Sequence, residues 1–225
     1  MLWLVLALIA ALTEAIAVQK NIRKLEFFAK PAVMVCLLIW LYASTGLQGS
    51  MLLFGLGILF SLVGDVALMS RSDRIFMLGL TAFLFTHVFY LIGFKEELLS
   101  FTAWSSILIL FIYVNSLRLL RRIVETMRLK GQGALSVPVI VYGLVISLML
   151  YVAMSTLYDS VWKTSAAVLV SVGAFLFYIS DLILAWNKFV APLKNGRVFN
   201  IVTYHLGQIG LIAGVINQFL SANPG

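Results

Sequence analysis

The sequence contains little of what a soluble protein or a thiolate site requires. Charged residues make up 11% of the 225 residues, whereas 62% are hydrophobic and the mean hydropathy is +1.06. A soluble domain carries about 25% charged residues, so this composition excludes a soluble globular fold, a disordered chain and a fibrous repeat. The single cysteine, Cys36, lies in an apolar run, which excludes an intramolecular disulfide and a thiolate-cluster metal site. The composition predicts an all-α membrane protein.

Motifs of several common enzyme classes are also missing. The chain has no G-x-S-x-G elbow, Walker A sequence, G-x-G-x-x-G or H-E-x-x-H, so serine hydrolases, nucleotide-binding proteins and standard metalloproteases have no support. Only two histidines are present, which disfavours a zinc site, although a site of two histidines and one carboxylate stays open. We therefore expect no metal and no other cofactor.

Eight apolar runs of spanning length follow one another along the chain. They cover residues 2–18, 31–47, 51–69, 75–94, 101–117, 135–154, 165–186 and 198–220. A membrane-spanning helix needs about 20 apolar residues, and the short connections leave no room for a separate soluble domain. We expect residues 1–225 to form a single eight-helix transmembrane domain.

Basic residues concentrate in alternate connections between these runs. Fourteen of the sixteen Lys and Arg residues lie after the first, third, fifth and seventh runs, and only Lys95 and Lys163 lie on the opposite side. Because Lys and Arg in short loops stay in the cytoplasm, both termini are predicted to be extracytoplasmic in a multi-pass protein of the bacterial inner membrane. The net charge of +7 is thus interpreted as a topology signal, and nucleic acid is not an expected partner.

The longest connection, residues 118–133, mixes basic and apolar residues. Leu119, Ile123 and Met127 recur in it at helical spacing among the arginines. The simplest interpretation is an ordinary positive-inside loop. The alternative is an extension of the fifth helix along the headgroups, where a cationic amphipathic surface would favour anionic lipid.

The two halves of the chain contain similar segments. Residues 57–69 read GILFSLVGDVALM and residues 173–185 read GAFLFYISDLILA, and at an offset of 116 positions Asp65 matches Asp181. Both segments are predicted to run from outside to inside. This pairing fits a parallel duplication of four helices plus four, with chance similarity between apolar helices as the alternative.

Most ionisable residues of the predicted spans lie in one layer. At 1.5 Å of rise per residue, Asp65, Glu14, Asp181 and His205 lie about 6 to 10 Å below the cytoplasmic helix ends. Lys30 lies near the same interface. Ionisable side chains in a bilayer are costly and normally face the bundle interior, which makes them functional candidates. His87, at about 18 Å by the same arithmetic, falls outside the layer.

Each candidate also has a purely structural interpretation. The interfacial pairs that this interpretation requires are Asp65 with Arg71 or Arg74, Asp181 with Lys188, and Glu14 with Lys20 or Lys30. His87 and His205 would then only form hydrogen bonds between helices. The two matched aspartates together are stronger evidence for a functional site than either one alone.

Two carboxyl groups in an apolar pocket suit acid chemistry on a lipid. Where their environments differ, one stays protonated as a general acid while its partner stays ionised as a base or cation stabiliser. We expect Asp65 and Asp181 to be this pair, with the assignment between them open. A substrate drawn from the lipid phase would then be cleaved without a nucleophilic serine or a metal.

Several segments resemble the lysoplasmalogenase (YhhN-like) membrane family. They are F-S-x-x-G-D-x-x-L-M at residues 60–69, the spacing of residues 76, 79, 83, 87 and 90, Ser180-Asp181 within 173–185, Lys30-Pro31, and residues 204–208. The resemblance spans nearly the whole chain. It implies an eight-helix hydrolase that cleaves the sn-1 vinyl ether of lysoplasmalogens, releasing a fatty aldehyde and a glycerophospho-base. His205 departs from the family's tyrosine-rich motif.

Vinyl ether hydrolysis agrees with the chemistry of the polar layer. Protonation of the vinyl carbon gives an oxocarbenium ion, which water captures, so the step needs one acid and one anion. The acid and the anion are expected to be Asp65 and Asp181, and Lys30 is expected to bind the phosphate of the lysophospholipid. The other residues that we expect to position substrate or water are Glu14, His87, Tyr204, His205 and Gln208.

Two other function classes remain open. A proton-coupled transporter of a small molecule or lipid also suits four-plus-four repeats with intramembrane carboxylates. Against it, the polar layer is predicted near one interface, whereas transporter sites usually lie near the midplane. The other class is a lipid-binding or assembly protein whose polar contacts are structural.

Overall fold

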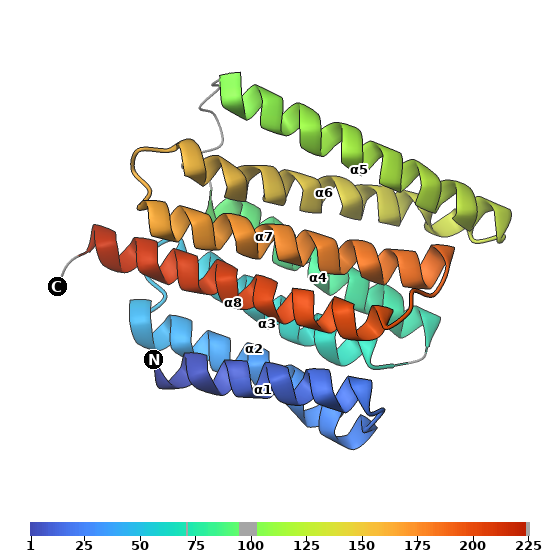
Figure 1. Cartoon of the computed structure of the whole chain (residues 1–225), viewed down its shortest axis with the longest axis horizontal. Helices are drawn as coiled ribbons and strands as arrows, with labels where there is room; N and C mark the ends of the chain where they lie inside the picture. The colour runs from blue at the N-terminus through green and yellow to red at the C-terminus, as the bar shows by residue number, and fades with distance from the viewer. Residues whose placement is uncertain (71, 95–102, 224–225) are drawn as a thin grey trace.

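The chain folds as a bundle of long helices that run roughly along one common axis (Figure 1). The computed structural model describes residues 1–70, 72–94 and 103–223, and both termini lie at the same end of the bundle. The described residues contain helices and turns but no strand. The all-α class predicted from composition is therefore confirmed.

Eight long helices lie in the part of the chain that the structure describes. They are α1 (Leu2–Gln19), α2 (Arg23–Thr45), α3 (Met51–Leu68), α4 (Asp73–Gly93), α5 (Ala103–Leu129), α6 (Ser136–Ser155), α7 (Thr164–Ala185) and α8 (Gly196–Ala222). Among the described residues, the segments of all but α5 are long and apolar enough to cross a membrane. The predictions for Arg71, for Lys95 and for a start of the fifth helix at Phe101 fall outside the described residues.

The second helix begins eight residues earlier than the apolar run predicted. α2 starts at Arg23 and contains Pro31 in its interior. A proline inside a helix removes one backbone donor, which membrane helices tolerate where neighbouring groups compensate. The N-terminal part of α2 makes such contacts through Glu26, which pairs with Arg197, and Lys30, which reaches Asp65. The apolar run misses this part because four of its eight residues are charged.

The segment 118–129 is helical, so the expected loop is wrong there and the alternative of an extended fifth helix is observed. Its apolar residues pack into a second core cluster that includes Ile123, Met127, Val139 and Phe189. Beyond the helix, the Lys130 ammonium donates to the carbonyl oxygens of Phe189 at 3.1 Å and Val190 at 2.7 Å. These contacts fix the end of α5 against the segment that follows α7.

α7 and α8 approach each other closely because glycines line their contact. A Cβ atom added at Gly173 would lie 2.4 Å from the backbone nitrogen of Leu211, and one added at Gly207 would lie 2.7 Å from the backbone nitrogen of Phe177. Small residues permit such approach where helices associate in a bilayer. This contact fixes Asp181 on α7 relative to Tyr204 and His205 on α8.

Candidate active site

Asp181 is held by two side chains from neighbouring helices. His87 on α4 places Nε2 2.9 Å from the Asp181 Oδ2 atom, and the Tyr142 hydroxyl on α6 donates to the same oxygen. The Ser180 hydroxyl lies 3.3 Å from the other carboxyl oxygen. His87 is fully buried and Asp181 is 9% exposed. Three helices thus converge on one carboxyl group.

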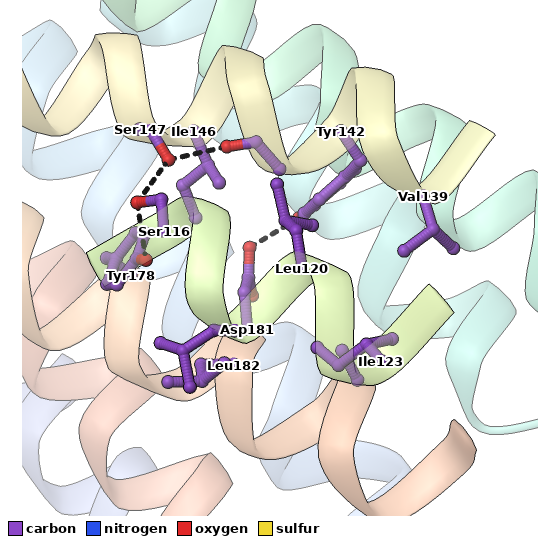
Figure 2. A pocket seen from close by; sticks show the side chains of 13 residues that line it. Ser116, Leu120, Ile123, Val139, Tyr142, Ile146, Ser147, Tyr178, Asp181 and Leu182 are labelled. Carbon is purple, nitrogen blue, oxygen red and sulfur yellow. Dashed lines mark hydrogen bonds between the residues drawn. The ribbon is translucent and has the colours of Figure 1, made fainter. Parts of the chain in front are cut away.

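An apolar cavity of about 50 Å³ reaches Asp181 from the side of α5 (Figure 2). Leu120 and Ile123 of α5 and Ile146 of α6 line it, and Tyr142 and Asp181 face each other across their hydrogen bond. The polar groups of the far part of the cavity bond to one another, with Ser147 Oγ 2.9 Å from Ser116 Oγ and Ser116 Oγ 2.8 Å from the Tyr178 hydroxyl. The lining residues include one carboxyl group, that of Asp181.

Asp65 belongs to a second polar cluster, built by α2, α3 and α8. The Lys30 Nζ atom lies 3.4 Å from Asp65 Oδ1, and the Tyr204 hydroxyl donates to Asp65 Oδ2 at 2.9 Å. Asp65 is fully buried, and the Lys30 side chain is 11% exposed. The structural interpretation that paired Asp65 with Arg74 is thus replaced by a buried pair with Lys30.

Glu14 and His205 form a third buried pair. The His205 Nε2 atom and the Glu14 Oε2 atom share a hydrogen bond between α8 and α1, and both side chains are almost completely buried. Neither Lys20 nor Lys30 is the partner of Glu14 in this pair. The rings of His205 and Tyr204 are adjacent, with centroids 4.9 Å apart, so this pair adjoins the Asp65 cluster.

Aromatic rings separate the two aspartates. The Phe177 ring lies 4.6 Å from the His87 ring and 5.4 Å from the Tyr204 ring, measured between centroids. Phe83 packs against Phe177 and Tyr204, and its ring fills the space beside Gly64. The structure thus places Asp65 and Asp181 in neighbouring clusters with a wall of rings between them.

Gln208 lies in a separate hydrogen-bonded chain between α8, α4 and α3. The Tyr90 hydroxyl donates to Gln208 Oε1 at 2.7 Å, and Gln208 Nε2 donates to the Ser61 hydroxyl at 2.7 Å. Ser61 in turn lies 3.1 Å from the Thr86 hydroxyl. Gln208 and Tyr204 share a helix face as expected, but their side chains bond to different partners.

The depth estimate for His87 is wrong, because it placed this residue about 10 Å from Asp181 along the membrane normal. Helix rise measures distance from each helix's own end, and these ends do not lie in one plane. α7 continues through the π-helical segment η4 (Trp186–Val190), so Asp181 lies further from the end of its helical segment than the apolar run indicated. The two side chains are in direct contact.

The sequence reasoning also missed Tyr142. A single tyrosine in an apolar run is an ordinary amphipathic aromatic residue, and no periodicity marks it as the partner of a carboxyl on another helix. Among the described residues, no three His, Cys, Asp or Glu side chains gather where they could hold one metal ion.

A sequence profile described as the YhhN family matches residues 25–215. The chain belongs to the YhhN family. The match begins within α2 and ends within α8, so it includes Lys30, both aspartates, His87, Tyr142 and Tyr204.

This YhhN chain is also similar to curated relatives. Lysoplasmalogenase TMEM86B of Mus musculus is 32% identical over 85% of this chain and 73% of its own length. Lysoplasmalogenase TMEM86A of Homo sapiens is 31% identical over 68% of this chain and 60% of its own length. Lysoplasmalogenase TMEM86B of Homo sapiens is 26% identical over 80% of this chain and 69% of its own length. No solved structure matches the chain.

Proposed function

We propose that this chain is a membrane-embedded lysoplasmalogenase, which hydrolyses the sn-1 vinyl ether of a lysoplasmalogen to a fatty aldehyde and a glycerophospho-base. The observation that carries the proposal is the Asp181 carboxyl in the wall of an apolar cavity, held by His87 and Tyr142, in a chain similar to named lysoplasmalogenases. The cavity suits a hydrocarbon, and the carboxyl suits proton transfer.

The reaction needs an acid group that gives a proton to the substrate and regains a proton in a later step. In the first step the acid group transfers its proton to the vinyl carbon that is not bonded to oxygen, and the other vinyl carbon and the ether oxygen share the positive charge. Water then bonds to the charged carbon and loses a proton to the carboxylate, which restores the acid. The hemiacetal breaks its bond to the glycerol oxygen, giving the aldehyde and the free hydroxyl, so water is the net reagent.

We assign the proton transfer to Asp181 and a positioning role to Asp65. Asp181 lines the cavity, whereas Asp65 is fully buried beside Lys30 and Tyr204. After the proton transfer, the Asp181 carboxylate is the negative charge beside the oxocarbenium ion, and in an interior of low dielectric it stabilises this ion more strongly than it would in water. Tyr204 and Phe177 connect the Asp65 cluster to His87, so the Asp65 cluster also positions the Asp181 cluster.

Glu14, His205 and Gln208 are proposed to act by positioning. Their side chains are buried and bonded to protein groups of α1, α3, α4 and α8. Each of these bonds connects α8 to another helix, and α8 carries Tyr204. We propose that they hold Tyr204 against Asp65.

The test is release of fatty aldehyde from a lysoplasmalogen by the purified protein in detergent. We expect release by the wild type and by Glu125→Gln, a control that removes an exposed carboxyl on α5. Asp181→Asn and Asp65→Asn should release none while remaining folded. Transport needs a sealed compartment, which detergent does not provide, and an assembly protein has no turnover. In either case neither the wild type nor any variant would release aldehyde, and that result would contradict the proposal.

We further propose that the chain consists of two four-helix repeats in parallel orientation. Asp65 of α3 contacts α2 and α8, and Asp181 of α7 contacts α6 and α4. Each aspartate thus bonds to the second helix of its own half and to the fourth helix of the other half. This exchange of equivalent partners supports a duplication more specifically than the sequence similarity of residues 57–69 and 173–185 does.

We also propose that the end of the bundle opposite the termini faces the cytoplasm of a bacterial cell. The connections and the adjoining helix ends there carry most of the basic residues, among them Arg74, Lys130, Lys188 and Arg197. Short basic loops are retained on the cytoplasmic side during insertion. A cysteine introduced at Lys194 should then react with a thiol reagent only after the inner membrane is permeabilised.

A further inference from the structure

Two more cavities continue from Asp181 towards the basic end of the bundle. One, of about 30 Å³, is lined by Leu80, Val139, Tyr142 and Asp181, and it ends at Phe76. Phe76 also lines the second, a depression of about 320 Å³ that is formed with Arg74, Gln132 and Lys188. The Lys188 ammonium lies over the Phe76 ring, 4.6 Å from its centroid. Phe76 therefore separates a basic surface depression from the space beside Asp181.

The three cavities lie in an order that matches the parts of a lysophospholipid. At 1.5 Å per residue, Lys188 lies roughly 10 Å from Asp181 along its helical segment. The apolar cavity extends about 12 Å from Val139 to Ser147 along α6, and Tyr142, the partner of Asp181, lies between these two residues. A lysolipid carries an anionic phosphate, a short glycerol segment, the vinyl ether and then the hydrocarbon chain. Basic, narrow and apolar parts follow one another in the same order.

We propose that Arg74 and Lys188 bind the phosphate of the substrate, and that the start of the alkenyl chain occupies the cavity between α5, α6 and α7. The glycerol then passes Phe76 and the vinyl ether lies beside Asp181. This assignment rests on the proposed function and names its phosphate subsite. The rest of the chain extends past α5 into the bilayer, which fits the position of α5 at the edge of the bundle in Figure 1.

The assignment differs from the expectation that Lys30 binds the phosphate. The Lys30 ammonium pairs with the Asp65 carboxyl, and both belong to the cluster beyond Phe83 and Phe177. A phosphate there would have to enter a cluster that is almost completely buried. Arg74 and Lys188 are exposed at the mouth of the depression. Arginine and lysine bind phosphate through charge-assisted hydrogen bonds.

The first experiment compares Arg74→Gln/Lys188→Gln with Arg23→Gln/Lys194→Gln. The control double variant removes the same charge from exposed positions at the same end, away from the depression. We expect the KM for lysoplasmalogen to rise at least about tenfold in the first variant, with a smaller change in kcat, because each charged hydrogen bond contributes about a factor of ten. Hydrolysis of an alkenylglycerol, which lacks phosphate, should not change in either variant.

Binding of a non-cleavable 1-O-alkyl lysophospholipid separates failure of this subsite from failure of the proposed function. We expect binding to weaken about tenfold in Arg74→Gln/Lys188→Gln and to stay near the wild-type value in the control. If the wild type binds the analogue in this way but releases no aldehyde from a lysoplasmalogen, the subsite stands and the hydrolase proposal fails. Equal loss in both double variants, no loss in either, or no binding by the wild type would overturn the subsite.

A second pair of variants tests the cavity assigned to the alkenyl chain. Leu119 lines the cavity from α5, whereas Leu110 on the same helix is 62% exposed. Leu119→Trp should narrow the cavity and raise the KM for the non-phosphorylated alkenylglycerol as well as for the lysolipid. Leu110→Trp should leave both unchanged. An unchanged KM in Leu119→Trp, with the protein folded, would contradict binding of the chain there.

Discussion

His87 and Asp181 lie on different helices and 94 positions apart in the sequence, and the His87 Nε2 atom lies 2.9 Å from the Asp181 Oδ2 atom. The Tyr142 hydroxyl lies 3.1 Å from the same histidine nitrogen and donates to the same carboxyl oxygen. The three side chains come from α4, α7 and α6, so the position of the Asp181 carboxyl depends on the packing of three helices.

Tyr142→Phe should lower aldehyde release about ten- to a hundredfold, because it removes one hydrogen bond to the carboxyl and keeps the ring. Tyr151→Phe is the matched control, since Tyr151 is equally buried on the same helix. It should keep activity within a few-fold of the wild type. Equal activity of the two variants in the aldehyde assay would show that the hydrogen bond from the Tyr142 hydroxyl to Asp181 has no role in catalysis.

Lys30→Met should lower the free energy of unfolding by about 3 to 5 kcal/mol, because it leaves the buried Asp65 carboxyl without its cationic partner. The double variant Lys30→Met/Asp65→Asn should recover most of this loss but release no aldehyde. Unfolding in mixed detergent micelles gives the first quantity, and the aldehyde assay gives the second. An active double variant would mean that Asp65 serves only to neutralise Lys30.

The buried Glu14–His205 pair and the Glu26–Arg197 pair provide a comparison within one molecule. Glu14→Gln should lower the free energy of unfolding by more than about 2 kcal/mol, because it leaves the buried His205 without its carboxylate partner. Glu26→Gln should cost less than about 1 kcal/mol, because the Arg197 side chain is 59% exposed. Unfolding measurements under one detergent condition test both, and an equal cost would contradict the burial argument.

Gly173→Ala should destabilise the protein by about 3 kcal/mol, the upper end of the usual cost of overpacking. The added Cβ would meet backbone atoms of α8, which cannot move independently of the helix. In Gly133→Ala the nearest neighbour is a side-chain atom of Arg128 at 3.8 Å, so the change should stay within about 0.5 kcal/mol. Thermal unfolding of both variants tests the close contact of α7 and α8.

Composition and hydropathy predicted the helical class and most helix positions, because a bilayer imposes long apolar helices on the sequence. The same signal failed where helices continue beyond the apolar runs. α2 begins among charged residues at Arg23, and α5 continues through the basic segment to Leu129. In both places tertiary contacts of polar or amphipathic residues support the helix, and a hydropathy profile does not report such contacts.

The candidate site could be predicted in part. The cost of burying charge identified Asp65, Asp181 and Lys30, and two of them form one pair. The pairing of His87 with Asp181 and the contribution of Tyr142 could not be predicted, because they depend on how helix ends are offset and how helices rotate about their axes. Neither quantity is encoded in local spacing.

The most direct test of the account is fatty-aldehyde release from a defined lysoplasmalogen by the purified protein in detergent, with Asp181→Asn, Asp65→Asn and Glu125→Gln measured alongside. We expect the wild type and Glu125→Gln to release one fatty aldehyde for each lysoplasmalogen consumed, and either aspartate variant to release none, with all four proteins folded. Near-normal release by Asp181→Asn, or no release by folded wild type, would contradict it.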